Sequence, residues 1–255
     1  MRYTNYTANG VGLNLAETGA GDSALVFLHY FGGSSRTWGP VMDLLAEGFH
    51  CLAPDARGWG DSDAPPTGYT VAAMADDVAA LIAAVGLTRY TLVGHSMGGK
   101  AAQALAARCP PGLERLLLVA PSPLSPEPMS EEARAKMRAG WGKEKAAHET
   151  LNTIAKLPLG REVAEAVIAD TLRASRVAWE SWADEGSRED LSELAAKIVV
   201  PTFVLVGESD PVLTPEALRR EVVEKIAGVT LTVVPGAGHL LPLEDAGAVA
   251  GWVRG

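Results

Sequence analysis

The segment Tyr90–Lys100, which reads YTLVGHSMGGK, carries the strongest structural signal in this 255-residue chain. It begins with a short apolar run, which is typical of a buried strand, and a helical pattern starts at Met97. Between them, Gly94–Gly98 matches the GxSxG pattern, in which small residues flank a serine on a sharp strand-to-helix turn. The pattern alone is weak, but its position between a strand and a helix makes Ser96 a candidate nucleophile.

Similar apolar runs recur along the chain and alternate with helical patterns. The predicted strands are Leu25–His29, Phe49–Ala53, Tyr90–Val93, Leu116–Ala120, Thr202–Val206 and Thr230–Val234. The predicted helices are Val71–Val85, Met97–Arg108, Pro215–Ile226 and Glu244–Val253. This alternation predicts an α/β fold with a mostly parallel, doubly wound sheet. In the first of these helices, Asp76 and Asp77 are expected on the solvent side.

The chain begins with two alternating segments, Arg2–Ala8 and Val11–Glu17, separated by Asn9-Gly10. Asn-Gly between alternating segments indicates a β-hairpin, because both residues tolerate a positive φ. We therefore expect antiparallel strands at one edge of the sheet.

One long segment, residues 121–197, interrupts the alternation. It begins with closely spaced prolines and then shows helical patterns over Glu131–Leu151 and Arg161–Trp182, without a convincing strand. It is too long for a simple loop. We predict an α/β core formed by residues 1–120 and 198–255, with residues 121–197 as a helical insertion.

The composition narrows the class of protein. Hydrophobic residues make up 47% and charged residues 21%, as in ordinary globular proteins. The formal charge of −9 argues against nucleic-acid or membrane-surface partners. The N-terminus shows no signal-peptide pattern, and the two cysteines, Cys51 and Cys109, have no metal-binding spacing. These features favour a cytoplasmic protein that acts on a small molecule; a monomer and a homodimer fit equally well.

A nucleophilic serine needs a base and an acid that orients the base. Asp210 follows the predicted strand Thr202–Val206, and His239 lies in a glycine-rich loop after Thr230–Val234. The carboxyl ends of parallel strands share one edge of the sheet, so Ser96, Asp210 and His239 are expected to converge there.

Other residues compete less well for these roles. His29 is expected to hold loop backbone, and His95 to form a local hydrogen bond beside the nucleophile. His50 begins a strand at the opposite edge, and His148 is expected on a solvated helix face. Glu208 is the alternative to Asp210, but it lies closer to its strand.

Acyl transfer also requires hydrogen-bond donors for the developing oxyanion. The backbone amide of Met97, at the start of a helix, is one expected donor. A second is expected from the loop His29–Ser34, where two adjacent glycines allow close approach to a substrate. A plain strand-to-helix turn is the alternative interpretation of this loop.

A nucleotide-binding pattern overlaps the GxSxG segment. Gly94–Lys100 fits GxxxxGK, but the next residue is Ala101, which lacks the hydroxyl needed to hold Mg²⁺. No later apolar strand ends in the required aspartate. The sequence therefore disfavours a nucleotide hydrolase.

Together these motifs resemble the α/β-hydrolase fold family, in its esterase and lipase-like branch, over nearly the whole chain. The matching motifs are GHSMGG, the strand-end GESD, the late GAGH and Asp55–Ser62 (DARGWGDS). The resemblance implies an eight-stranded, mostly parallel sheet with a helical cap inserted after the sixth strand, where residues 121–197 fall. It implies no metal or organic cofactor.

The resemblance also implies roles for individual residues. Ser96 would be the nucleophile, His239 the base and Asp210 the orienting acid, with Phe31 and Met97 as backbone oxyanion donors. The family usually has glycine after the histidine that begins the oxyanion loop, where this chain has Tyr30. A tyrosine cannot adopt positive φ without cost, and its hydroxyl could enter the pocket.

The expected activity is that of a serine carboxylesterase acting on small or medium acyl esters. Three alternatives use the same triad: an enol-lactone hydrolase, a perhydrolase or cofactor-free haloperoxidase, and a carbon–carbon bond hydrolase. A non-catalytic ligand receptor on the same fold is a further alternative. Trp141 and Trp179, with Tyr30, are candidate substrate-binding residues, although the tryptophans suit packing of a helix onto the core equally well.

Overall fold

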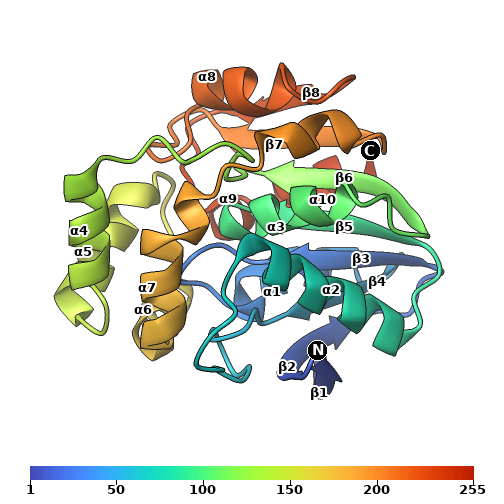
Figure 1. Ribbon diagram of the computed structural model, residues 1–255, viewed down its shortest axis with the longest axis horizontal. Coiled ribbons are helices and arrows are strands. Elements are labelled where there is room, and N and C mark those ends of the chain that lie inside the picture. The colour runs from blue at the N-terminus through green and yellow to red at the C-terminus, as the bar shows by residue number, and fades with distance from the viewer.

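The computed structural model describes residues 1–255 and contains one eight-stranded sheet with the order β1-β2-β4-β3-β5-β6-β7-β8 (Figure 1). The strands are β1 (Arg2–Ala8), β2 (Val11–Thr18), β3 (Ser23–Leu28), β4 (Phe49–Pro54), β5 (Tyr90–His95), β6 (Leu113–Val119), β7 (Thr202–Gly207) and β8 (Thr230–Val234). The neighbouring strands β4, β3, β5, β6, β7 and β8 pair in parallel. Strand β2 is antiparallel to both of its neighbours, β1 and β4. The predicted fold class and the strands of the alternating pattern are confirmed.

The predicted hairpin forms at the edge of this sheet. β1 pairs with β2 in the register Ala8↔Val11, and the two residues between them have φ of +51° at Asn9 and +76° at Gly10. Both turn residues are therefore in the left-handed region, as a tight hairpin turn requires.

Helices cover both faces of the sheet and bury two apolar layers. On one face, α2 (Val71–Val85) and α3 (Met97–Ala106) pack over the sheet, and on the other face α1 (Gly39–Leu45) and α10 (Ala246–Arg254) do so. The crossovers of a parallel sheet place helices on both faces, which explains why the central strands are apolar along their whole length. The carboxyl ends of the parallel strands remain at one edge, where the loops carry the candidate site.

Two predicted helices differ in detail from the structure. Pro215–Ile226 forms α8 (Pro215–Leu218) followed by a π-helical turn, η4 (Arg219–Val223). The last helical pattern is divided between α9 (Leu241–Glu244) and α10, because Asp245 interrupts the helix and caps α10 through the amide of Ala248. Helical periodicity does not mark such breaks.

The predicted exposure of Asp77 is wrong. Asp76 is exposed, but the side chain of Asp77 is buried against the Arg57 guanidinium, with Arg57 Nε donating to Asp77 Oδ2 at 2.6 Å. Arg57 also donates to the carbonyl of Gly68 at 2.7 Å. The ion pair thus fixes the loop after β4 to α2.

Between β6 and β7 the chain forms only helices. They are α4 (Glu131–Ala139), α5 (Glu144–Ile154), α6 (Arg161–Arg173), α7 (Arg176–Asp184) and the short 3-10 helices η2 (Gly186–Arg188) and η3 (Ser192–Lys197). In Figure 1, α4 to α7 form a group to the left of the sheet. Gly140 and Gly142, which interrupt the helical pattern, lie between α4 and α5.

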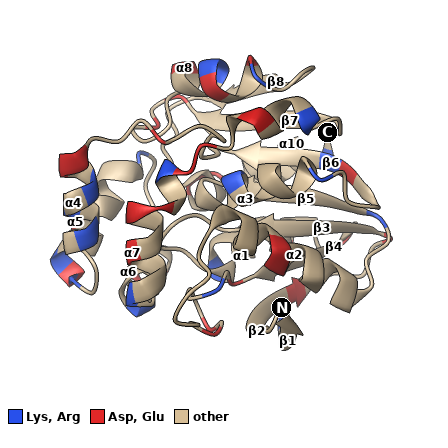
Figure 2. Cartoon of the chain, in the orientation of Figure 1, with Lys and Arg blue, Asp and Glu red and all other residues tan.

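Charged residues of both signs are distributed over the outer helices, α4 to α7 included (Figure 2). No helix in the structure is both long enough and apolar enough to span a bilayer. One further 3-10 helix, η1 (Ser35–Trp38), leads from the loop after β3 into α1.

Candidate active site

Ser96 lies on a strained turn between β5 and α3. Its backbone has φ of +50° and ψ of −117°, which side-chain-bearing residues rarely adopt. A methyl group at Gly98 would lie 2.6 Å from the carbonyl oxygen of His29, and one at Gly94 would lie 2.7 Å from Gly99 Cα. Glycine is therefore required on both sides of Ser96, because β5, α3 and the neighbouring loop approach so closely.

Asp210 and His239 are in direct contact. His239 Nδ1 donates to Asp210 Oδ2 at 2.8 Å, and both side chains are buried. The other carboxylate oxygen of Asp210 accepts the amides of Val212 and Leu213 at 2.8 and 2.9 Å. These bonds fix the carboxylate in the orientation that receives the His239 N–H.

His239 also lies next to the turn that carries Ser96. His95 Nε2 donates to the carbonyl oxygen of His239 at 2.8 Å, and the two imidazole rings are 5.1 Å apart. The His239 amide donates to the carbonyl of Ile154, the last residue of α5, at 2.8 Å. No hydrogen bond joins Ser96 Oγ to His239. The structure thus brings His239 together with Asp210 and beside the residue that precedes Ser96.

The surroundings change how readily His239 binds a proton. Burial lowers its pKa, but the negative charge of Asp210 and the hydrogen bond to it raise the pKa more, and the result lies above the usual 6.5. The nearby carboxylates of Glu127 and Glu244 act in the same direction. An imidazole with this partner is a stronger base than a free one.

The other histidines have different roles. His29 is buried; its Nδ1 donates to the carbonyl of Tyr30 at 2.8 Å, and its Nε2 accepts the amide of Ala56 at 3.0 Å. Burial lowers its pKa, so the ring stays neutral and connects two loops. His50 pairs with Glu17 at 2.7 Å on the side away from the site, and His148 is exposed.

Glu208 does not compete with Asp210 for His239. Its carboxylate accepts the amide of Gly236 at 3.0 Å and so braces the loop that leads to His239. Asp210, two residues further along the chain, is the carboxylate that bonds to the imidazole of His239.

The two amides expected to bind an oxyanion lie on segments that are in contact. The amide of Gly98 donates to the carbonyl of His29 at 3.1 Å, which holds the loop after β3 against the start of α3. The amides of Phe31 and Met97 donate no hydrogen bond within the chain. Tyr30 keeps a negative φ, and Gly32, at φ of +88°, supplies the left-handed conformation instead. The tyrosine therefore does not strain this loop.

Aromatic rings from the insertion pack against this loop. The ring of Phe31 lies 4.4 Å from that of Trp179 and 5.1 Å from that of Trp59. Trp179 Nε1 donates to the carbonyl of Met137 at 2.8 Å, and Trp141 Nε1 donates to that of Ala174 at 2.8 Å. Both indoles thus join helices of the insertion to one another, and Trp179 also covers Phe31.

Lys100, which belongs to the overlapping GxxxxGK pattern, is engaged inside the protein. Its side chain is fully buried, and Nζ donates to the carbonyls of Glu189 at 2.6 Å and Ser125 at 3.3 Å. Burial lowers its pKa to about 8. The ammonium therefore connects α3 to both segments that link the insertion to the sheet and does not point to a phosphate site.

Sequence patterns missed one acidic residue near the site. Glu127 accepts a hydrogen bond from the hydroxyl of Ser122, whose amide in turn donates to the carbonyl of Ser96 at 2.9 Å. Burial raises the pKa of Glu127. Its position between Pro126 and Pro128 is the only sequence signal that singles it out.

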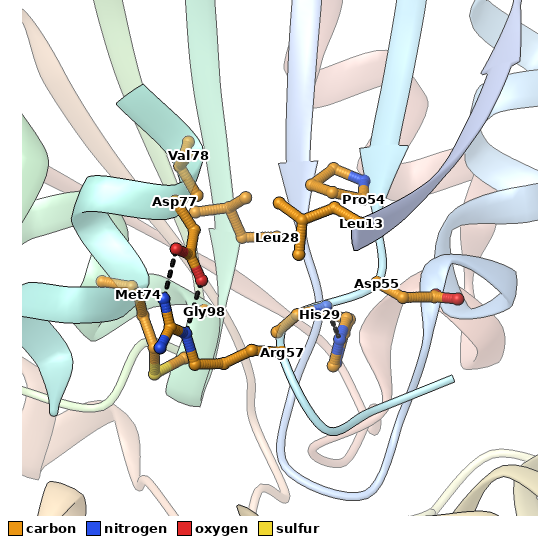
Figure 3. Close-up of a pocket in the computed structure, with 12 residues that line it drawn as sticks. Leu13, Leu28, His29, Pro54, Asp55, Arg57, Met74, Asp77, Val78 and Gly98 are labelled. Atoms are coloured by element: carbon orange, nitrogen blue, oxygen red, sulfur yellow. Dashed lines mark hydrogen bonds and ion pairs between the residues drawn. The ribbon is translucent and has the colours of Figure 1, made fainter. Parts of the chain in front are cut away.

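A small cavity of about 30 Å³ lies behind the loop that contains His29. Figure 3 shows Asp77 reaching from its helix to Arg57, with His29 and Asp55 on the opposite side. The space suits one or two water molecules rather than a substrate. No three His, Cys, Asp or Glu side chains are arranged to hold a metal ion.

A model of the alpha/beta hydrolase family matches residues 25–252 of this chain. The chain belongs to the alpha/beta hydrolase family. A mouse protein named sn-1-specific diacylglycerol lipase ABHD11 is 31% identical over 89% of this chain and 78% of its own length. The bifunctional esterase/perhydrolase DCH of Acinetobacter calcoaceticus is 28% identical over 94% of both chains.

Two further proteins are similar to this chain, one over nearly its whole length and one over part of it. The enol-lactonase of Burkholderia xenovorans superimposes with a TM-score of 0.85 at 26% identity and covers 98% of each chain. An uncharacterised protein of Mycobacterium tuberculosis is 36% identical, but the match covers 45% of this chain and the chain spans only 37% of that relative's length. The relatives have different names and activities, so membership of the family does not fix the substrate.

Proposed function

We propose that this α/β hydrolase cleaves carboxylic esters of small to medium acyl groups through an acyl-enzyme on Ser96. The observation that supports this most is the hydrogen bond between His239 and Asp210, beside the strained turn that carries Ser96. On such a turn the serine hydroxyl is presented to the carbonyl carbon that it attacks, and a buried His–Asp pair supplies the base.

In the first half of the proposed reaction, Ser96 Oγ attacks the carbonyl carbon while His239 Nε2 takes the hydroxyl proton. The carbonyl electron pair moves onto oxygen, which accepts hydrogen bonds from the amides of Phe31 and Met97. The imidazolium then gives its proton to the alcohol oxygen as the C–O bond breaks. Asp210 stabilises the imidazolium in this step.

In the second half, water replaces the alcohol. His239 takes a proton from the water, whose oxygen attacks the acyl carbon of the ester formed on Ser96. The tetrahedral intermediate collapses, Ser96 Oγ recovers its proton from the imidazolium, and the carboxylic acid leaves. The proposed reaction steps need no group beyond water, these side chains and the two backbone amides.

We also propose that residues 121–197 form a cap that shapes the acyl-binding region over the core of residues 1–120 and 198–255. The contact between Trp179 and Phe31 supports this role, because it places an indole from the insertion on the residue that carries an oxyanion amide. The indole N–H of Trp141 is bonded to Ala174, the residue that follows α6, and the ring of Tyr30 lies 5.1 Å from that of His95.

An enol-lactone hydrolase is the second candidate. The observation in its favour is the 26% identity with the Burkholderia xenovorans enol-lactonase over 98% of the chain. A lactone is an internal ester, so the same steps apply, with the leaving alcohol still attached to the acyl group.

Turnover of p-nitrophenyl esters from acetate to octanoate tests the proposal. Hydrolysis should be lost in Ser96→Ala and reduced about 10⁴-fold or more in His239→Ala, whereas His148→Ala, at an exposed histidine, should match the wild type. A fluorophosphonate should add its mass to the peptide that contains Ser96.

Undiminished hydrolysis by Ser96→Ala would place the nucleophile elsewhere. Turnover of enol-lactones without turnover of any linear ester would select the second candidate instead.

A further inference from the structure

A second pocket, of about 180 Å³, lies between α6 and the segment that joins β3 to α1. Its walls include apolar side chains from both sides, among them Pro40, Ala166, Val167 and Leu243. Ser96, Asp210 and His239 do not line it. The three triad candidates therefore lie outside this pocket, although Tyr30, a candidate substrate-binding residue, lines it.

Two hydroxyl groups open into this pocket without partners. Tyr30 and Thr37 are only 4% and 3% exposed, and neither hydroxyl makes a hydrogen bond within the chain. Neither hydroxyl oxygen is fully enclosed by protein atoms, so each can be reached by a molecule in the pocket. Both hydroxyls are thus available to a guest molecule.

Tyr30 and Thr37, which both line the pocket, approach each other next to Gly33. A methyl group there would lie 2.5 Å from Tyr30 Cε1 and 2.7 Å from Thr37 Oγ1. Glycine at this position lets the Tyr30 ring and the Thr37 hydroxyl lie side by side. The chain has Tyr30 where related proteins usually have glycine, and the glycine at position 33 leaves room for the ring of this tyrosine.

The charged residues of the pocket are mostly engaged. Asp170 accepts hydrogen bonds from the Ser34 hydroxyl at 2.7 Å, from Arg36 and from Arg173. Glu162 makes no ion pair. The lining contains one positive and two negative side chains, Arg36 against Asp170 and Glu162, so its net charge of −1 disfavours an anion.

The size of the pocket sets the size of its guest. A cavity of about 150 Å³ lined by apolar side chains holds benzene. The present pocket is slightly larger, has an apolar wall and presents two unpartnered hydroxyls on one side. A six-membered ring with one hydroxyl fills such a space and satisfies at least one of them.

We propose that this pocket is an accessory binding site for a neutral, phenol-sized molecule that hydrogen-bonds to the hydroxyls of Tyr30 and Thr37. The site goes beyond the proposed esterase activity and does not depend on it. It is nevertheless close to the candidate triad, because the Tyr30 ring lies 5.1 Å from that of His95, which holds the carbonyl of His239.

Titration of the ¹⁵N-labelled protein with phenol tests the site. Amide shifts should saturate and should be centred on residues 34–37 and 163–170. Benzene should bind more weakly than phenol, because it cannot bond to the hydroxyls, and benzoate should not bind, because of its charge.

Three variants separate this site from other surfaces. Ala166→Phe should abolish phenol binding by filling the pocket, whereas Ala169→Phe, on the exposed side of the same helix, should bind normally. Tyr30→Phe should weaken phenol binding by about two- to tenfold and leave benzene binding unchanged, as expected for the loss of one neutral hydrogen bond.

The proposal is wrong if phenol causes no saturable shifts, or if the shifts are centred on residues 94–99 and survive Ala166→Phe. Equal loss of phenol and benzene binding in Tyr30→Phe would show that the hydroxyl makes no bond to the guest. None of these outcomes depends on whether the protein hydrolyses esters.

Discussion

Ser96 holds a backbone conformation that a side chain makes costly. Its φ of +50° is fixed by hydrogen bonds on both sides: its amide donates to the carbonyl of Val119 at 3.2 Å, and its own carbonyl accepts the amide of Ser122 at 2.9 Å. Strain of this kind amounts to roughly 1–3 kcal/mol per residue. The contacts around the turn maintain this strain, and the proposed nucleophile needs a side chain at this position.

Replacement of Ser96 by glycine should relieve this strain. We expect Ser96→Gly to unfold at a higher temperature than Ser96→Ala, with a difference of about 1 kcal/mol in the free energy of unfolding, and we expect both variants to be inactive. Calorimetry of the two proteins measures the difference. At Ala72, an exposed position in the regular helix α2, replacement by glycine should destabilise the protein instead. If Ser96→Gly were less stable than Ser96→Ala, the backbone at position 96 would not be strained.

The pH dependence of hydrolysis should follow the protonation of His239. Asp210 raises the pKa of His239, so activity should rise with pH through a midpoint above 6.5, as the imidazole loses its proton. Asp210→Asn removes the negative charge, and the midpoint should then move to lower pH while kcat falls by about 10⁴-fold. The pH profile of kcat/KM measures both effects.

The matched control is Glu208→Gln, since Glu208 bonds to Gly236 and not to His239. Its midpoint should stay where the wild type has it. A midpoint that is unchanged in Asp210→Asn would argue that another residue is the base.

Helix α6 and the loop after β3 are joined mainly by the carboxylate of Asp170, beside one longer hydrogen bond from the Thr171 hydroxyl to the carbonyl of Gly32 at 3.4 Å. It accepts hydrogen bonds from the Ser34 hydroxyl, from Arg36 and from Arg173 and is itself almost fully buried. Since this loop carries Phe31, its position relative to the insertion depends on Asp170.

Asp170→Ala should therefore lower both stability and activity. Loss of the charged hydrogen bonds, with the proton of the buried Ser34 hydroxyl left without its acceptor, should reduce the free energy of unfolding by about 2 kcal/mol. Urea denaturation and kcat/KM measure the two effects. Glu165→Ala breaks the exposed pair with Arg161 on the same helix and should cost less than about 0.5 kcal/mol. Equal effects of the two substitutions would refute the role of Asp170.

The parallel strands were predictable because each is a short apolar run. Such a run must be buried, and this holds without knowing which strands are its neighbours in the sheet. Helix α1 was not predicted, since its seven residues are too few to show periodicity. The π-helical turn after α8 was missed because a hydrophobic pattern does not reveal which carbonyl each amide bonds to.

The candidate triad was predictable from strand ends, because parallel strands bring their carboxyl ends to one edge. The partners of that triad were not. The bond from His95 to the carbonyl of His239 and the pairing of Asp77 with Arg57 join segments far apart in the sequence. No local pattern encodes contacts of that kind, which form only when the whole sheet is assembled.

Buried neutral histidines make the folded protein sensitive to acid. Burial lowers the pKa of His29 and holds that of His95 well below 6.5, so below pH 6.5 the unfolded chain binds protons that the folded chain does not. Each of these groups removes up to about 1.4 kcal/mol of stability per pH unit as the pH falls. His239, whose pKa is raised, has the opposite effect: its contribution is present below pH 6.5 and is lost above its folded pKa.

We therefore expect the urea midpoint to fall between pH 7 and pH 5. The control variant is His148→Ala, at an exposed position, which should show the same decrease as the wild type. His95→Asn should show a smaller decrease. A midpoint that is constant over this range would mean that the two buried rings accept protons in the folded state.

The position of Lys100 restricts how the insertion can move. Its ammonium holds the carbonyls of both Ser125 and Glu189, one on each chain segment that connects α4–α7 to the sheet. Swinging of the whole insertion away from the core would break both bonds together and leave a buried cation without acceptors. Substrate entry must therefore use displacements within the four helices themselves, with their attachment to α3 kept intact.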